Sequence, residues 1–204
     1  MRPLNWGTTP MLLSGLKKRE LALQARDLVA RLAPNADPRN LCLYHAAAII
    51  EVASQELGER FILLAGSAFW PSVSPERDDG VSPNLFGYQW EGGQLDGTLL
   101  PEMHVWAGCP ATNDYVDLTT RYWPEQCEAL TGRRWLAPSP PDFWWAAPER
   151  LPHRVTYAPE RAAAVAAEGH QAHVRLFVDR AHGADDLRLR PRRAAGQLRR
   201  AAAH

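Results

Sequence analysis

The chain has 204 residues, 46% of them hydrophobic and 23% charged, and its 23 Lys and Arg balance its 23 Asp and Glu. This composition is typical of a soluble globular protein of about one domain, and it excludes collagenous, fully disordered and disulfide-scaffold proteins. The net charge of zero is the sum of two unequal parts. From Arg180 to the end, seven Arg and two Asp give a net charge of +5, so the remainder of the chain has a net charge of −5. We therefore expect one domain over 1–180 and a basic, disordered tail over 181–204.

Two helices are predicted in the first third of the chain. The first begins after Ser14, a favourable N-cap residue, and ends before the Pro-containing breaker 34–38. The second begins near Asn40 and ends at Leu57, with Gly58 as its C-cap. Its run of Ala predicts close packing, so we expect this second helix at the centre of the fold.

After the second helix the hydrophobic period changes to two, which is typical of strands. The predicted strands are 61–70, 85–91, 102–107, 114–119 and 173–179. Short helices are predicted over 124–130 and 159–168, and the Pro- and Trp-rich segment 138–148 is predicted to be irregular. Helices followed by strands without crossover helices favour an α+β fold, with the N-terminal helices packed on an antiparallel sheet.

Three cysteines, Cys42, Cys109 and Cys127, are too few and too irregularly spaced for a disulfide framework. The sequence shows no signal peptide and no apolar run near the 20 or so residues of a membrane span, so we expect a reduced, cytoplasmic protein without a membrane partner. A zinc site of His104, Cys109 and Cys127 lacks the paired close spacing of structural zinc sites. No metal and no other cofactor is therefore predicted.

Cys42, His104 and Asp117 stand in an order that suits nucleophilic catalysis. Cys42 opens the second predicted helix, where the unpaired N–H groups and the helix dipole favour a thiolate. An imidazole beside a thiolate can pair with it and pass on its proton, and a carboxylate behind the imidazole fixes its tautomer. With 108–113 as the loop of a hairpin, His104 and Asp117 are equally far from the turn. We predict that they lie opposite each other or nearly so on one face, with Cβ atoms about 4.5–5.5 Å apart.

Several other residues are candidates for the same site. Trp106 shares a face of the strand with His104, so we expect it to shield the imidazole–carboxylate pair from water and to border the substrate cleft. The backbone N–H of Cys42 is one expected oxyanion donor, and Gln89 or Trp90 on the neighbouring strand is a candidate side-chain donor. The Trp- and Pro-rich segment 123–148 is the candidate for one wall of the cleft.

Three short motifs also carry a resemblance to a known family. They are Asn40-Leu41-Cys42-Leu43-Tyr44-His45-Ala46, His104-Val105-Trp106 and Tyr115-Val116-Asp117-Leu118-Thr119. In order and spacing, over about 40–120, they resemble the transglutaminase-like branch of the papain-like cysteine hydrolases. That branch includes bacterial peptidases, peptide-processing proteases, arylamine acetyltransferases and deamidating effectors, which share a thioester intermediate.

The resemblance implies a papain/transglutaminase-like core and a role for each residue of the triad. Cys42 would be the nucleophile, His104 the base and Asp117 the group that orients the base. The upstream Gln that papain-type members use at the oxyanion hole has no counterpart that can be placed in this sequence.

The sequence is compatible with an enzyme and with a non-enzymatic protein. The leading hypothesis is a cysteine-dependent peptidase or amidase, or an acyl-transferase, acting on a peptide, a protein or a small amide. The alternative is a non-enzymatic interaction protein, because a Cys in an Ala-rich helix is commonly a packing residue. His45 competes with His104 for the role of base, and we expect it to serve in core packing. The Arg-rich tail lacks interleaved aromatic residues, which disfavours a nucleic-acid partner.

Overall fold

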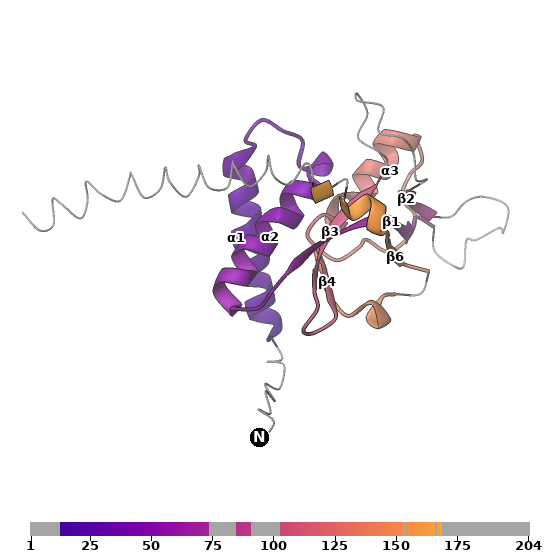
Figure 1. The fold of residues 1–204 in the computed structure, drawn as a ribbon. Coiled ribbons are helices and arrows are strands. Elements are labelled where there is room, and N and C mark those ends of the chain that lie inside the picture. The colour runs from indigo at the N-terminus through magenta and orange to yellow at the C-terminus, as the bar shows by residue number, and fades with distance from the viewer. Residues whose placement is uncertain (1–12, 74–84, 91–102, 153, 166, 169–204) are drawn as a thin grey trace, which may run out of the picture.

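The computed structural model describes residues 13–73, 85–90 and 103–168, except for 153 and 166. Helices α1 (Gly15–Leu32) and α2 (Cys42–Leu57) run side by side next to an antiparallel sheet, and the shorter helix α3 (Trp123–Thr131) lies away from them (Figure 1). The α+β class and the packing of the N-terminal helices on an antiparallel sheet are thus as predicted. The predicted strand 173–179 and the basic tail 181–204 lie outside the described residues.

Capping residues account for the start of α1 and the end of α2. The Ser14 hydroxyl accepts the backbone N–H of Lys17 at 3.2 Å, and Gly58 ends α2 in the left-handed region with φ of 67°. Helix α2 begins at Cys42, two residues after Asn40, near which its start was predicted, because Asn40 ends a short 3₁₀ helix, η1 (Pro38–Asn40). Asp37 caps that turn by accepting the N–H of Arg39 at 3.0 Å, so α2 begins at Cys42.

The sheet has the strand order β2-β1-β3-β4-β5, and every pairing is antiparallel. Its strands are β1 (Ile62–Pro71), β2 (Leu85–Tyr88), β3 (His104–Cys109), β4 (Asp114–Asp117), β5 (Trp144–Ala146) and β6 (Thr156–Pro159). The long strand β1 pairs with β3 along its first half and with β2 along its second half. Strand β6 pairs with the middle of β1, so β1 is hydrogen-bonded to three other strands.

Two of these strands were not predicted. Strand β5 lies inside the segment 138–148 that was predicted to be irregular. Strand β6 comes just before the helix that was predicted over 159–168, of which residues 161–165 and 167–168 are helical. Both strands have only three or four residues, too few for an alternating pattern to be visible in the sequence. They form because β4 and β1 offer edges to pair with.

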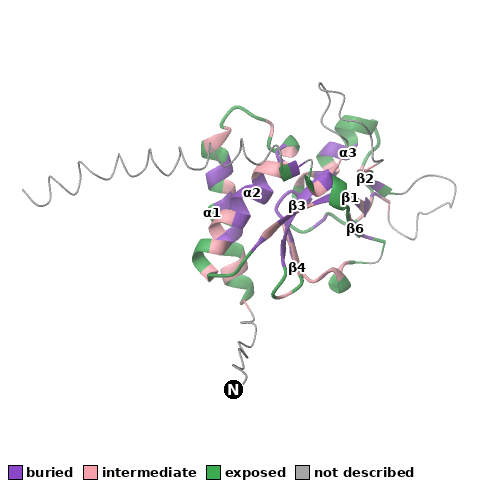
Figure 2. Ribbon diagram, in the orientation of Figure 1, coloured by how far each residue is buried: buried purple, intermediate pink, exposed green. Residues whose placement is uncertain are grey.

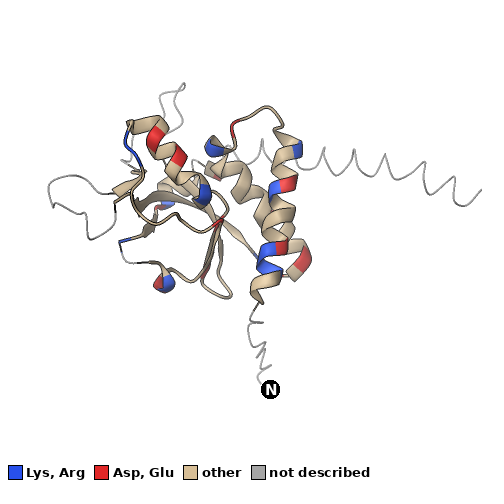
Figure 3. Cartoon of the chain, turned by 180° about the vertical axis from the view of Figure 1, so that it is seen from behind, with Lys and Arg blue, Asp and Glu red and all other residues tan. Residues whose placement is uncertain are grey.

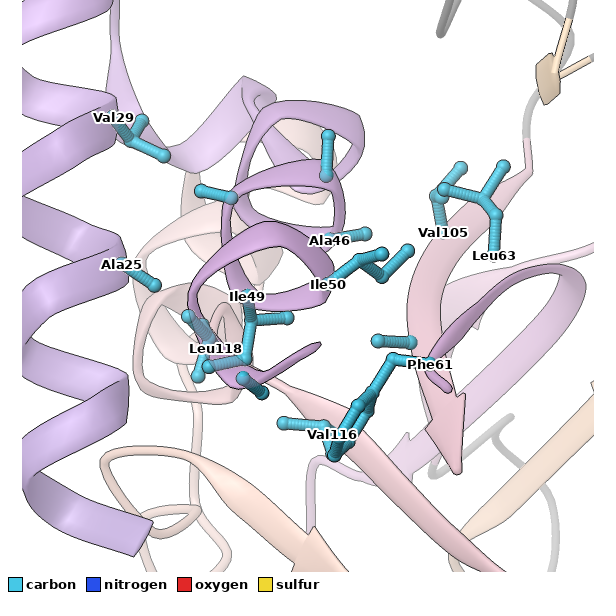
Figure 4. Close-up of a cluster of buried hydrophobic side chains, with 14 of the residues drawn as sticks. Ala25, Val29, Ala46, Ile49, Ile50, Phe61, Leu63, Val105, Val116 and Leu118 are labelled. Atoms are coloured by element: carbon cyan, nitrogen blue, oxygen red, sulfur yellow. The ribbon is translucent and has the colours of Figure 1, made fainter. Parts of the chain in front are cut away.

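Side chains pack on both faces of the sheet. The helix-side core lies between α1, α2 and the sheet and includes Ala25, Ile49, Val105, Val116 and Leu118 (Figure 4). Helix α2 is at its centre, with buried residues along most of its length (Figure 2). The aromatic core covers the opposite face and consists of Ala68, Trp70, Phe86, Trp106, Trp123, Cys127, Val155 and Tyr157. Alternate residues of β1 and β3 therefore point into different cores.

Charged residues are found mainly in the helices and on the loops between elements (Figure 3). Within the described part of the chain, Asp117 is the one Asp or Glu that is buried, with 2% of its surface exposed. A buried carboxylate is costly unless hydrogen-bond donors or a positive charge surround it. No helix among the described residues combines the length and the apolar character that crossing a membrane requires.

Candidate active site

The hairpin of β3 and β4 brings His104 and Asp117 to one face of the sheet. Its closing pair is Cys109 with Asp114, so the loop is 110–113 and shorter than predicted. Continued by one residue, this register places Asp117 across from Trp106, with His104 two residues further along. Of the two predicted arrangements, opposite or nearly opposite, the structure has the second. The side chains meet diagonally, with Nε2 of His104 2.7 Å from Oδ2 of Asp117.

Asp117 accepts four hydrogen bonds. Its Oδ2 accepts from His104 Nε2 at 2.7 Å and from the Tyr157 hydroxyl at 2.6 Å. Its Oδ1 accepts from the backbone N–H and the hydroxyl of Thr119, at 2.8 and 2.6 Å. Burial favours the protonated carboxyl, but the charge of His104 and these hydrogen bonds outweigh it and lower the pKa of Asp117 to about 2. Asp117 is therefore an ionised, fully occupied acceptor.

Cys42 completes this arrangement from helix α2. Burial opposes a charged imidazole, but the Asp117 carboxylate, together with hydrogen bonding to Cys42 and the charge of Cys42, raises the pKa of His104 to about 10. Cys42 therefore lies close enough to His104 to act on its pKa. Because Nε2 is bound to Asp117, Nδ1 is the ring nitrogen left for another partner. Cys42 is also partly exposed, whereas Cys109 and Cys127 are buried free thiols.

Aromatic rings enclose the imidazole of His104. The ring of Tyr88 is stacked on it with centroids 5.6 Å apart, Trp106 lies 6.0 Å away in a near-parallel orientation, and Trp123 contacts it edge-on at 5.1 Å. These faces suit a cationic imidazolium and keep water from its bond to Asp117. Trp106 has no exposed surface, so it can shield the pair from water. The prediction that it also borders a substrate cleft is wrong for the same reason.

The backbone at the start of α2 offers a donor for an oxyanion. Leu41, the N-cap residue, makes no side-chain capping bond, and the first intrahelical bond of α2 runs from the N–H of His45 to Leu41 O. The N–H of Cys42 therefore has no acceptor within the helix. Gln89, the candidate side-chain donor, is exposed directly after β2, and its role stays a prediction. Trp90 donates its backbone N–H to Ser67 Oγ at 2.9 Å.

His45 lies one helical turn after Cys42, but its surroundings differ from those of His104. Its side chain is buried with 3% exposed, and neither ring nitrogen has a hydrogen-bond partner among the described residues. Burial, with a smaller effect of the nearby Arg26, lowers the pKa of His45 to about 4. It is thus a neutral ring near pH 7, packed in the core, and His104 is the imidazole that can serve Cys42.

We expect the substitution His45→Leu to stabilise the protein, and to do so more strongly as the pH falls. Removing a buried polar ring without partners should raise the free energy of unfolding by about 1 kcal/mol near pH 7. Below pH 6.5 the wild type also loses stability, because its unfolded state takes up a proton that the folded state binds only near pH 4. Urea unfolding at several pH values measures both effects. A variant less stable than the wild type at about pH 5 would contradict this account.

The Trp- and Pro-rich segment borders a cavity, although not one that includes Cys42. The cavity has a volume of about 330 Å³ and is lined by Trp70, Pro71, Val73, Ala137, Pro138, Ser139, Pro141, Pro152, Arg154 and Val155. It lies against the aromatic core, to which Trp70 belongs. Among the described residues, no cluster of three or more His, Cys, Asp or Glu is placed to hold a metal ion.

Two partners of Asp117 were missed from the sequence. Thr119 had a local signal, since an Asp followed two residues later by Thr is a common pattern for a side-chain-to-backbone turn. Tyr157 had none, because 40 residues separate it from Asp117 and its strand was not predicted.

The chain matches no family model, no curated protein and no solved structure.

Proposed function

We propose that this protein is a cysteine-dependent hydrolase of amides, a peptidase or amidase, with Cys42 as nucleophile, His104 as base and Asp117 as the group that orients the base. One observation carries the proposal: the imidazole of His104 is bound to the buried carboxylate of Asp117 and lies near enough to the partly exposed thiol of Cys42 for that thiol to act on its pKa. The papain/transglutaminase-like core suggested by the three motifs belongs to the same proposal.

The first half of the reaction forms a thioester. His104, held protonated by Asp117, gives the Cys42 thiolate its counter-ion. The sulfur attacks the carbonyl carbon of the amide, and the developing oxyanion accepts the backbone N–H of Cys42. As the C–N bond breaks, Nδ1–H of His104 donates its proton to the leaving nitrogen, so an amine departs and the acyl group remains on the sulfur.

The second half releases the acyl group. The neutral His104 takes a proton from water, the hydroxide oxygen attacks the thioester carbonyl, and the C–S bond breaks to give a carboxylic acid and the thiolate. An amine or hydroxyl acceptor in place of water would make the same site an acyl-transferase. Asp117 keeps Nε2 protonated throughout, so Nδ1 alone exchanges the proton.

The arrangement around His104 favours chemistry over mere packing. A buried ion pair is costly to desolvate and is often less stabilising than apolar residues of similar volume. Here the buried pair of His104 and Asp117 lies next to the thiol of Cys42, which is partly exposed to solvent. An interaction protein on the same fold would gain nothing from a charged imidazole directed at that thiol.

The pH dependence of thiol alkylation tests the proposal without a known substrate. We expect iodoacetamide to label Cys42 at about pH 6, where an ordinary thiol with a pKa near 8.5 is almost unreactive. The variant His104→Gln keeps a polar side chain of similar size but removes the cation. Its Cys42 should react at least about tenfold more slowly at pH 6 and at a similar rate at about pH 9. Peptide mass spectrometry of the labelled protein gives the rate at each cysteine.

The two buried thiols, Cys109 and Cys127, are internal controls for unfolding, because they become labelled only when the fold opens. A second probe, p-nitrophenyl acetate, should leave an acetyl group on Cys42 and none on a Cys42→Ser variant. Equal labelling of Cys42 in the wild type and in His104→Gln at pH 6 would overturn the proposed function and leave the interaction-protein alternative.

A further inference from the structure

Tyr157 lies at the end of a line of hydrogen-bond donors that leads to Asp117. Its hydroxyl is 2.6 Å from Asp117 Oδ2, the oxygen that also binds His104. On its other side, Nε1 of Trp70 is 3.2 Å from the same hydroxyl oxygen. Tyr157 comes from β6 and Trp70 from the far end of β1, so two strands outside the hairpin reach into the site.

The direction of each bond in this line is fixed by chemistry. An indole N–H can only donate, so the Tyr157 oxygen accepts from Trp70. The hydroxyl proton of Tyr157 is then free to point at Asp117, whose ionised carboxylate can only accept. Burial and the charge of Asp117 raise the pKa of Tyr157 well above its usual value, so the phenol keeps that proton.

We propose that Tyr157, oriented by Trp70, is a positioning residue that holds Asp117 ionised and in place for His104. This inference rests on the proposed function, since it concerns the same triad. Without the Tyr157 hydroxyl, Oδ2 of Asp117 keeps only the imidazole as a partner, and the carboxylate can rotate while Oδ1 keeps its two hydrogen bonds from Thr119. The imidazole then loses its fixed direction toward Cys42, and the thiolate–imidazolium pair weakens.

The variant Tyr157→Phe removes this one hydroxyl and leaves the ring. We expect its Cys42 to react with iodoacetamide about three- to tenfold more slowly than the wild type at about pH 6, and equally fast at about pH 9, where ordinary thiols are also ionised. With p-nitrophenyl acetate we expect kcat to fall by a similar factor and KM to stay within about twofold. A role in packing alone would not move the rate at one pH and spare it at the other.

Tyr115→Phe is the matched control. Tyr115 packs against Tyr157 with centroids 6.4 Å apart, but its hydroxyl is not among the partners of Asp117. It should label like the wild type at both pH values. If Tyr157→Phe unfolds, which labelling of the buried Cys109 would show, Trp70→Phe is the second variant. It leaves the Tyr157 hydroxyl without its donor, so a smaller loss in the same direction is expected.

The outcomes separate this inference from the proposed function. If His104→Gln slows labelling at pH 6 and Tyr157→Phe does not, the triad stands and the role of Tyr157 is overturned. If neither variant changes the rate at pH 6, the proposed function itself fails. A loss in both, with Tyr115→Phe unchanged, supports the positioning role.

Discussion

Asp117→Asn should be the most damaging single isosteric change in this protein. The free energy of unfolding should fall by about 3 kcal/mol, because His104 and its other donors lose a buried charge partner. The rate of acylation by p-nitrophenyl acetate should fall by at least about 100-fold, because the tautomer of His104 is no longer fixed. Chemical denaturation at neutral pH and the release of p-nitrophenol measure the two effects.

The size of this effect follows from the number of donors around Asp117. Each carboxylate oxygen accepts two hydrogen bonds, one pair from Thr119 and the other from His104 and Tyr157. An amide has one oxygen and one NH₂ group, so in either orientation it directs an NH₂ group at a pair of donors. With the NH₂ group toward Thr119, the backbone N–H of Thr119 is left without an acceptor. With the NH₂ group toward His104, Nε2 can only accept after giving up its proton, so the buried cation is lost.

The same substitution should also remove a pH dependence of stability. The folded pKa of His104 is about 10, above the ordinary value of 6.5, so its stabilising contribution is fully present below pH 6.5 and is lost as the pH rises through 10. In Asp117→Asn the stability should change little over that range. Asp37→Asn is the control, because the ion pair of Asp37 with Arg39 is open to solvent and should contribute little to stability at any pH. An Asp117→Asn variant within 1 kcal/mol of the wild type would contradict the ionised carboxylate described above.

Gly66→Ala is expected to have a comparable effect on stability through the backbone alone. A Cβ at residue 66 would lie 2.2 Å from the carbonyl oxygen of Ala158 and 2.9 Å from the nitrogen of Glu160. Gly66 also has φ of 156°, close to conformations that are essentially restricted to glycine. The clash must push β6 away from β1, so we expect a loss of about 3 kcal/mol in the free energy of unfolding.

The Gly66→Ala variant should also lose thiol reactivity at about pH 6, because β6 carries Tyr157 away from Asp117 when it moves. Gly15→Ala is the control: no heavy atom lies within 4 Å of a Cβ there, and Ala in the first turn of α1 should be neutral or stabilising by up to about 1 kcal/mol. Thermal unfolding of both variants gives the comparison. Equal melting temperatures would show that β6 can shift at little cost.

The local signals in the sequence predicted the local elements well. Helix α1 begins after Ser14 and helix α2 ends at Gly58, as the capping rules predict. Those rules succeed because they depend only on the hydrogen bonds of one helix turn. The start of α2 was displaced because Asp37 offers a competing cap three residues before Asn40. The class of fold followed from the order of helices and strands, which needs no knowledge of pairing.

The parts that depend on pairing between distant segments were not predictable. The register of β3 and β4 was misjudged by two residues, because loop 110–113 is tighter than the Gly108 and Pro110 signals suggested. Strand β6 is visible only through its pairing with β1, so Tyr157 had no pattern of its own. Chemistry-bearing residue types pointed to Cys42, His104 and Asp117. Of the other donors to the carboxylate, Thr119 had a local signal and Tyr157 had none.

The pairing of β6 with β1 also has a consequence for the order of events during folding. The thiol and the carboxylate come from the first and middle parts of the chain, but the last donor to Asp117 arrives with residue 157. Contacts of such long sequence separation form late, after local helices and hairpins. Under the proposed function, we therefore expect Cys42 to become reactive only after β6 has paired with β1 and has brought Tyr157 to Asp117.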